Sequence, residues 1–131
     1  MAGPINDDAL DILFREGRTF DAFLDRPVPD ELLRRAYDLA RMTPTSANCQ
    51  PMRILFVRSD EAKHLMAPTL SSTNRDKSVR APVTAIIAHD LEFYENLPRL
   101  YRVPGAEKWF MGQDGLIEET AFRNAALQGA S

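Results

Sequence analysis

Residues 43–57 decide the fold, and they read Thr-Pro-Thr-Ser-Ala-Asn-Cys-Gln-Pro-Met-Arg-Ile-Leu-Phe-Val. The first part is a polar loop held between Pro44 and Pro51, and the second, from Ile54 to Val57, is an apolar run. A short apolar run without alternation is typical of a strand that is buried on both faces. Polar loops at strand ends often bind ligands, but Ser and Asn are also common in ordinary turns. The composition of this loop by itself favours the ordinary turn.

Outward from this loop, stretches with helical periodicity alternate with a second buried strand, which is expected over residues 83–88. Helices are expected over residues 7–16, 30–42, 60–70 and 90–97, and a last helix begins near Asp114. Asn6 or Asp7 is a suitable N-cap residue for the first of these helices, and Ser59 or Asp60 for the third. Residues 71–77 form a small polar stretch, and residues 98–112 look irregular. Helices interleaved with buried strands predict a sheet that is covered by helices.

The last expected helix is apolar on more than one side, which is the pattern of a helix surrounded by protein. Its apolar residues are Leu116, Ile117, Ala121, Phe122, Ala125, Ala126, Leu127 and Ala130. No stop signal precedes Ser131, at which the sequence given ends. We therefore expect residues 1–131 to form a single domain that is incomplete at its C-terminus and exposes a large apolar patch.

The overall composition argues against several classes of protein. With 131 residues, 44% hydrophobic and 27% charged, the chain has the size and composition of one soluble globular domain. A net charge of −3 gives no basic field to hold nucleic acid or an anionic membrane. Cys49 is the single cysteine, and neither a secretory signal nor a membrane span is visible, so a cytoplasmic location is expected. His64 and His89 lack partners at metal-ligand spacing, so no metal site is expected.

Two further groups of residues carry weaker signals of ligand binding. Arg18 is followed by Thr19, and a guanidinium beside a hydroxyl suits phosphate oxygens. Asn74 and Lys77 are three residues apart, so they share a face if the segment is helical. Each group, taken alone, is more typical of a solvated surface than of a binding site.

The order of these signals resembles the nitroreductase-like family of flavoproteins. That family has a Pro-[Ser/Thr]-[Ser/Thr]-x-Asn-x-Gln-Pro loop, which residues 44–51 match in full. It also has an Arg- and Ser-rich segment that ends on Phe, matched by residues 18–23, and a later Asn-x-x-Lys pair, matched by Asn74 and Lys77. Segments 81–88, 90–98 and 118–124 are most similar to one branch of the family, the malonic semialdehyde reductases of pyrimidine breakdown, also described as 3-hydroxypropanoate dehydrogenases.

The resemblance implies an α+β fold, with a central β-sheet flanked by helices on both faces, and a homodimer that binds FMN at the subunit interface. FMN would carry hydride from NAD(P)H to a small-molecule substrate, while the protein supplies binding, orientation and electrostatics. The implied FMN contacts are Arg18, Thr19, Thr45, Ser46, Asn48, Gln50, Asn74 and Lys77. No residue stands out as the proton donor. Gly17 and Asp21 stand where many members of the family carry basic residues.

Three functions remain open from the sequence. The first is the reduction of malonic semialdehyde to 3-hydroxypropanoate, and the second is the reduction of nitroaromatics or quinones with the same flavin. The third is that of a truncated remnant, without catalytic activity, or of an interaction partner of a full-length subunit.

Overall fold

The computed structural model describes residues 3–131, and it places a short two-stranded sheet among helices. The helices are α1 (Asp7–Leu10), extended by a π-helical turn (Asp11–Arg15), α2 (Asp30–Ala40), α3 (Asp60–Met66), α4 (Ser72–Arg80), α5 (Leu97–Leu100) and α6 (Asp114–Ala130). The strands are β1 (Met52–Val57) and β2 (Thr84–His89). Short 3-10 turns cover Ser46–Asn48, Ala67–Thr69, Phe93–Asn96 and Ala106–Trp109.

Most expected elements are confirmed. The side chains of Asn6 and Ser59 accept hydrogen bonds from Ala9 N and Ala62 N, so each of them, and not the Asp that follows it, caps its helix. The polar stretch after residue 70 is a helix, α4, and the region expected to be irregular contains short helical turns. The expected α+β class is confirmed.

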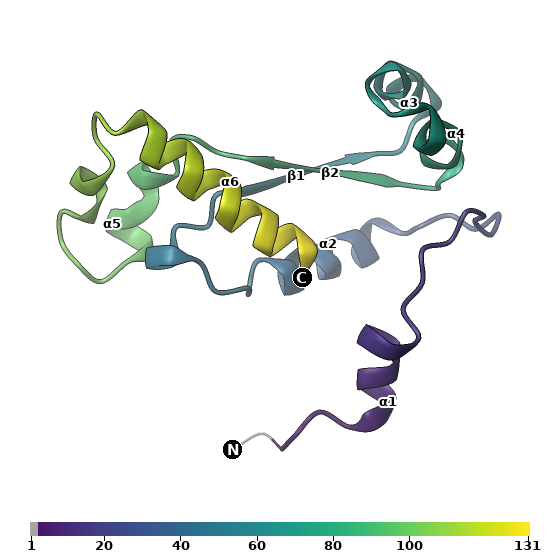
Figure 1. Cartoon of the computed structure of the whole chain (residues 1–131), viewed down its shortest axis with the longest axis horizontal. Coiled ribbons are helices and arrows are strands. Elements are labelled where there is room, and N and C mark those ends of the chain that lie inside the picture. Colours follow the sequence, from purple (N-terminus) through teal and green to yellow (C-terminus); the bar gives the residue numbers. More distant parts are fainter. Residues whose placement is uncertain (1–2) are drawn as a thin grey trace.

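β1 and β2 run antiparallel, in a register that pairs Met52 with His89 and Val57 with Thr84. This pairing gives the sheet two distinct ends (Figure 1). One end carries the loop that precedes β1 and the segment that follows β2. The other end carries α3 and α4, which connect the two strands (Figure 1). We call these the loop end and the α4 end.

α6 covers one face of the sheet. It approaches β2 so closely that a Cβ atom added at Gly129 would lie 2.8 Å from side-chain carbons of Ile87, so a larger residue there would require a shift. The ring of Phe122 meets His89 edge-on, with centroids 6.1 Å apart. On the opposite face Leu55 is 61% exposed, and Ile86 is also exposed. The expectation that both strands are buried on both faces is therefore wrong for this chain, because α6 packs against one face only.

The hydrophobic core lies at the loop end. Its buried members are Cys49, Phe93, Leu97, Ala106, Phe110 and Ala121. The rings of Phe93 and Phe110 meet edge-on with centroids 4.9 Å apart, a favourable aromatic arrangement. The segment after β2 thus packs against the start of α6, and the two together enclose Cys49 of the polar loop.

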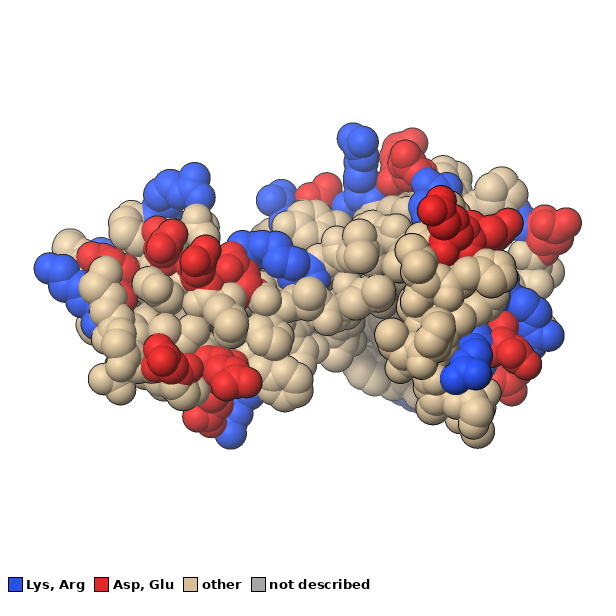
Figure 2. All heavy atoms as spheres, turned by 90° about the horizontal axis from the view of Figure 1, so that it is seen from above, with Lys and Arg blue, Asp and Glu red and all other residues tan. Residues whose placement is uncertain are grey.

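Many large apolar side chains are exposed, as expected from the pattern of the last helix. On α6 these include Leu116, Phe122 and Leu127, and on α1 and its π-turn Leu13 and Phe14. Figure 2 shows an uncharged area in the middle of one face, with charged side chains along its upper edge and over the two ends. Within residues 3–131, no helix is long and apolar enough to cross a membrane.

Candidate functional site

The polar loop before β1 has an unusual backbone. Ala47, Asn48 and Gln50 have φ values of 50°, 51° and 47°, in the left-handed region that residues other than glycine rarely occupy. Such conformations are costly and persist only where the surroundings fix them, and they are common at functional sites. The loop is therefore held in shape by contacts with the rest of the chain.

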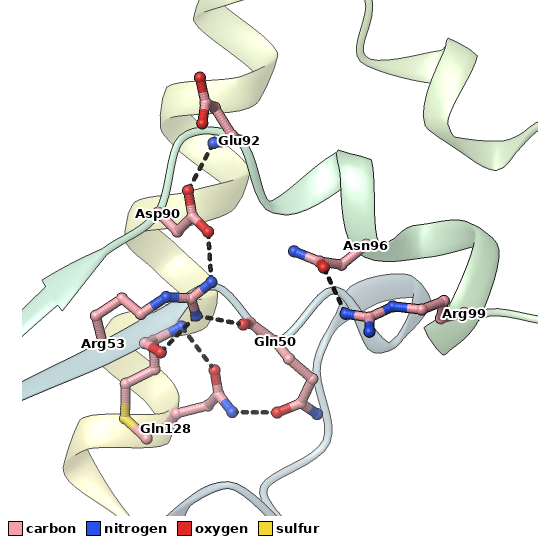
Figure 3. Close-up of polar contacts among 8 residues, drawn as sticks. Gln50, Arg53, Asp90, Glu92, Asn96, Arg99 and Gln128 are labelled. Carbon is pink, nitrogen blue, oxygen red and sulfur yellow. Dashed lines mark hydrogen bonds and ion pairs between the residues drawn. The ribbon is translucent and has the colours of Figure 1, made fainter.

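Two amide side chains of α6 provide those contacts. Asn124 accepts a hydrogen bond from Ser46 N at 2.8 Å and donates one to Thr120 O. Gln128, 1% exposed, donates to Gln50 Oε1 at 2.6 Å and accepts from Met52 N at 3.3 Å (Figure 3). Asn124 and Gln128 are four residues apart, so one face of α6 carries both.

The sequence analysis did not single out these two amides. The signal that could have found them is an Asn and a Gln at i and i+4 within an otherwise apolar helix, since buried amides need partners.

The loop amides are also bonded to the protein. Asn48 donates from Nδ2 to Leu100 O at 2.8 Å, and its Oδ1 accepts from Gln50 Nε2 at 2.8 Å. Thr45 Oγ1 accepts from Gln50 N at 3.3 Å. Asn48 is nevertheless exposed, as is Ser46. Of the four expected site residues of the loop, these two are the exposed ones, and they sit on a backbone that the surrounding contacts fix.

An ion pair between Arg53 and Asp90 joins β1 to the residue that follows β2 at the loop end. Arg53 pairs with Asp90, and it also donates to Gln50 O at 3.2 Å and Met52 O at 2.9 Å (Figure 3). Asp90 in turn accepts from Glu92 N at 2.8 Å. Arg53 and Asp90 therefore link the exit of the loop to the segment that follows β2.

Cys49 points away from solvent as a small packed side chain. It is 1% exposed, and burial raises the pKa of its thiol. A buried neutral thiol is a poor nucleophile, so Cys49 is a core residue.

The remaining expected residues lie at the α4 end. Lys77 Nζ lies 3.3 Å from Asp21 Oδ1, and this ion pair ties α4 to the segment that follows Arg18 and Thr19. Arg18 uses Nη1 to donate to Arg15 O and Gly17 O, whereas its other guanidinium nitrogens make no hydrogen bond with the described residues. Thr19 and Asn74 are exposed.

The structure thus divides the expected site residues into two groups. Thr45, Ser46, Asn48 and Gln50 share the loop end, while Asn74 and Lys77 lie beyond the far end of β1 (Figure 1). Six strand residues separate the two ends, a span of about 20 Å at the usual rise per residue. The implied FMN contacts therefore do not line one cavity within a single chain, because the loop precedes β1 and α4 follows it.

Comparison with known proteins identifies the family. The sequence profile described as the Nitroreductase family matches residues 17–129. The chain belongs to the Nitroreductase family. Both groups of candidate residues in this nitroreductase-family chain lie inside the matched range.

Relatives in two bacteria share about half of their aligned residues with this nitroreductase-family chain. Both proteins carry names that describe them as an NADH dehydrogenase/NAD(P)H nitroreductase. The Burkholderia lata protein is 52% identical over 126 residues, which are 96% of this chain and 65% of that protein. The Stenotrophomonas maltophilia protein is 51% identical over 130 residues, which are 99% of this chain and 66% of that protein. The chain therefore spans just under two-thirds of the length of these relatives.

A solved structure confirms the nitroreductase fold. It is a protein of Exiguobacterium sibiricum, assigned by name as a nitroreductase and solved in complex with FMN. It superposes with a TM-score of 0.80 over 98% of this chain and 69% of that one, at 16% identity. At this identity the similarity concerns the fold alone.

Proposed function

We propose that this chain is the larger part of an FMN-dependent oxidoreductase that uses NAD(P)H. The observation that carries the proposal is the match of residues 17–129 to the Nitroreductase family, which includes the constrained polar loop. The names of the two bacterial relatives support NAD(P)H as the reductant, and the Exiguobacterium sibiricum complex supports FMN. When bound, FMN would supply the hydride chemistry, and the chain would position and enclose it.

The donor groups of the chain fit FMN chemically. Arg18 has guanidinium nitrogens that make no hydrogen bond with residues 3–131 and could bind the phosphate, with Thr19 beside it. The exposed Ser46 and Asn48, with Thr45 and Gln50 behind them, suit the ribityl hydroxyls and the polar edge of the ring. Asn74 and Lys77 offer an amide and an ammonium to the polar atoms of the ring.

Because these groups lie at opposite ends of the sheet, we propose that two copies build each site. The loop end of one copy and the α4 end of the other would then face the same FMN. The exposed apolar residues of α6, among them Phe122 and Leu127, support a homodimer, since large apolar patches mark interaction surfaces.

For the physiological reaction we propose the reduction of malonic semialdehyde to 3-hydroxypropanoate. Its support is the similarity of segments 81–88, 90–98 and 118–124 to that branch of the family. The names of the relatives favour a second candidate, the reduction of nitroaromatics, and quinones belong to the same class of acceptor. Turnover of malonic semialdehyde, nitrofurazone and menadione with NADH and with NADPH separates these candidates.

FMN binding is the decisive test, and it requires a protein of full family length. A suitable chimera joins this chain, at its C-terminal end, to the part of the Burkholderia lata relative that lies C-terminal to the aligned residues. We expect the chimera to be yellow and dimeric by flavin absorbance and light scattering, and the 131-residue chain to be colourless or aggregated. A colourless, folded chimera would favour a remnant or interaction partner, and a soluble, yellow, active 131-residue chain would contradict the incomplete-domain expectation.

Arg18 tests the phosphate contact within that chimera. A charge-assisted hydrogen bond contributes roughly 1.5–3 kcal/mol, so Arg18→Ala should weaken FMN binding about ten- to a hundredfold in a fluorescence titration. Arg102→Ala is the matched control, because Arg102 is also exposed and makes no ion pair with the described residues. An unchanged dissociation constant for Arg18→Ala would remove this residue from the site.

A further inference from the structure

A basic hollow lies between the segment that precedes α2 and the ends of α3 and α4. Its volume is about 450 Å³, which is within the usual range for small-molecule sites. It is lined by Phe23, Leu24, Asp25, Arg26, Pro27, Lys63, Arg80 and Pro82. None of these residues belongs to the two groups assigned to FMN above, so the hollow is a separate feature of the α4 end.

Lys63 is the most unusual of the lining residues. It lies on α3 and is only 8% exposed, yet its ammonium makes no ion pair or side-chain hydrogen bond with the described part of the chain. Among the described residues no buried side-chain nitrogen or oxygen lacks a partner, so the buried part of Lys63 is its methylene stem, and its unpaired ammonium is open to the hollow. The hollow is the space into which an anionic partner of Lys63 would fit.

The rest of the lining is also positive. Arg26 and Arg80 flank the hollow, and neither makes an ion pair within residues 3–131. Asp25 is the one carboxylate among the lining residues, so three cations face a single negative charge. The nearby Lys77 is already neutralised by Asp21, and it adds little to this field.

We propose that this hollow binds the phosphate group of a phosphate monoester. Two guanidinium forks and an ammonium match the several oxygens and the double negative charge of a phosphate better than the two oxygens of a carboxylate. The apolar lining from Phe23, Leu24, Pro27 and Pro82 would pack against the organic part of the ester. The inference does not depend on the proposed function, because it rests on the hollow alone.

Phosphate binding to the chain tests this inference directly. The affinity for inorganic phosphate is measured by calorimetry at constant ionic strength, with acetate as the carboxylate control. We expect Lys63→Met and Arg80→Gln each to weaken phosphate binding about tenfold or more, as expected for the loss of one charge-assisted bond. Arg102→Gln, on a distant exposed site, should stay within about twofold of the parent chain.

Stability without phosphate gives a second, independent readout. Lys63→Met keeps the buried apolar stem and removes an accessible ammonium, so it should leave the midpoint of thermal unfolding in phosphate-free buffer nearly unchanged while abolishing the upward shift that phosphate causes in the parent chain. A lysine with a purely structural role would give a lower midpoint in both buffers, and that result would overturn the proposal. Equal losses of phosphate affinity in Lys63→Met and Arg102→Gln, or equal affinities for acetate and phosphate, would also overturn it.

Competition identifies the source of the phosphate. FMN and 5′-AMP are titrated against bound inorganic phosphate, in parallel with riboflavin and adenosine, which carry no phosphate. Displacement by 5′-AMP but not by adenosine supports the proposal. Displacement by FMN but not by 5′-AMP would contradict it, because the FMN phosphate is assigned to Arg18, which does not line the hollow. Displacement by riboflavin or adenosine to the same extent would contradict it.

Discussion

The two ends of the sheet hold their polar residues in different ways. At the loop end, Asn124 and Gln128 of α6 form hydrogen bonds with the loop, and the side-chain amides of Asn48 and Gln50 form a hydrogen bond with each other. At the α4 end, a single ion pair between Lys77 and Asp21 connects α4 to the N-terminal segment, and Asp21 is 84% exposed. The loop end is therefore fixed before any ligand binds, whereas the α4 end is held mainly by solvated charges.

The polar loop, residues 44–51, contains residues that fix its backbone and residues that stay exposed. The amides of the polar loop bond the backbone and each other, while Ser46 and Asn48 stay exposed to solvent. A fixed loop loses little entropy on binding, so it suits the recognition of a defined group. The α4 end offers charge instead, which acts at longer range and is more sensitive to salt.

The largest expected difference between the two ends concerns the core. Phe93 is fully buried at the loop end, so Phe93→Ala should lower the free energy of unfolding by about 3–5 kcal/mol. Leu65→Ala, on α3 at the other end, should change it by less than about 0.5 kcal/mol, because Leu65 is 74% exposed. Urea unfolding followed by circular dichroism measures both. Similar losses for the two variants would mean that the α4 end has a core of its own.

The next effect concerns the amide contacts under the loop. Gln128→Ala would leave Met52 N and Gln50 Oε1 without partners and open a small cavity, so we expect a loss of about 2–3 kcal/mol. The control is Gln113→Ala, since Gln113 is exposed and its side chain makes no capping hydrogen bond. A loss of less than about 0.5 kcal/mol for Gln128→Ala would show that the loop does not depend on α6.

Sequence periodicity predicted α1, α2, α3, α6 and both strands because their apolar spacing and caps are local properties, but it did not predict α4, whose residues are mostly polar. It did not predict that the loop rests on Asn124 and Gln128, because those contacts join residues 78 positions apart in the chain. The separation of Asn48 from Lys77 was also missed. The order of motifs along a chain does not give the distance between them in the fold. Here the length of β1 separates Asn48 from Lys77. The basic hollow at Lys63 was missed for the same reason, since its cations come from three separate segments.

A smaller effect concerns Cys49 and pH. Burial raises the pKa of this thiol in the folded chain above its value in the unfolded chain. The neutral thiol therefore favours folding fully below the ordinary thiol pKa of about 8.5, and this contribution is lost as the pH rises through the higher pKa of the folded chain. Unfolding free energies of the parent chain and Cys49→Ala, measured from pH 7 to 10, should converge as the pH rises. Parallel curves would mean that the thiol is not protected from ionisation.

The smallest effect on stability, and the sharpest test of the α4 end, comes from the pair formed by Lys77 and Asp21. Because Asp21 is largely exposed, Asp21→Asn should lower the free energy of unfolding by no more than about 1 kcal/mol, and by less at high salt. In the FMN-binding chimera the same change should strengthen FMN binding several-fold, because it releases Lys77 and removes a negative charge from the end that carries Arg18. Glu95→Gln, an exposed charge at the loop end, is the control and should leave the FMN affinity unchanged. Weaker FMN binding in Asp21→Asn would mean that the ion pair positions Lys77 rather than competing for it, and the α4 end would then be as preorganised as the loop end.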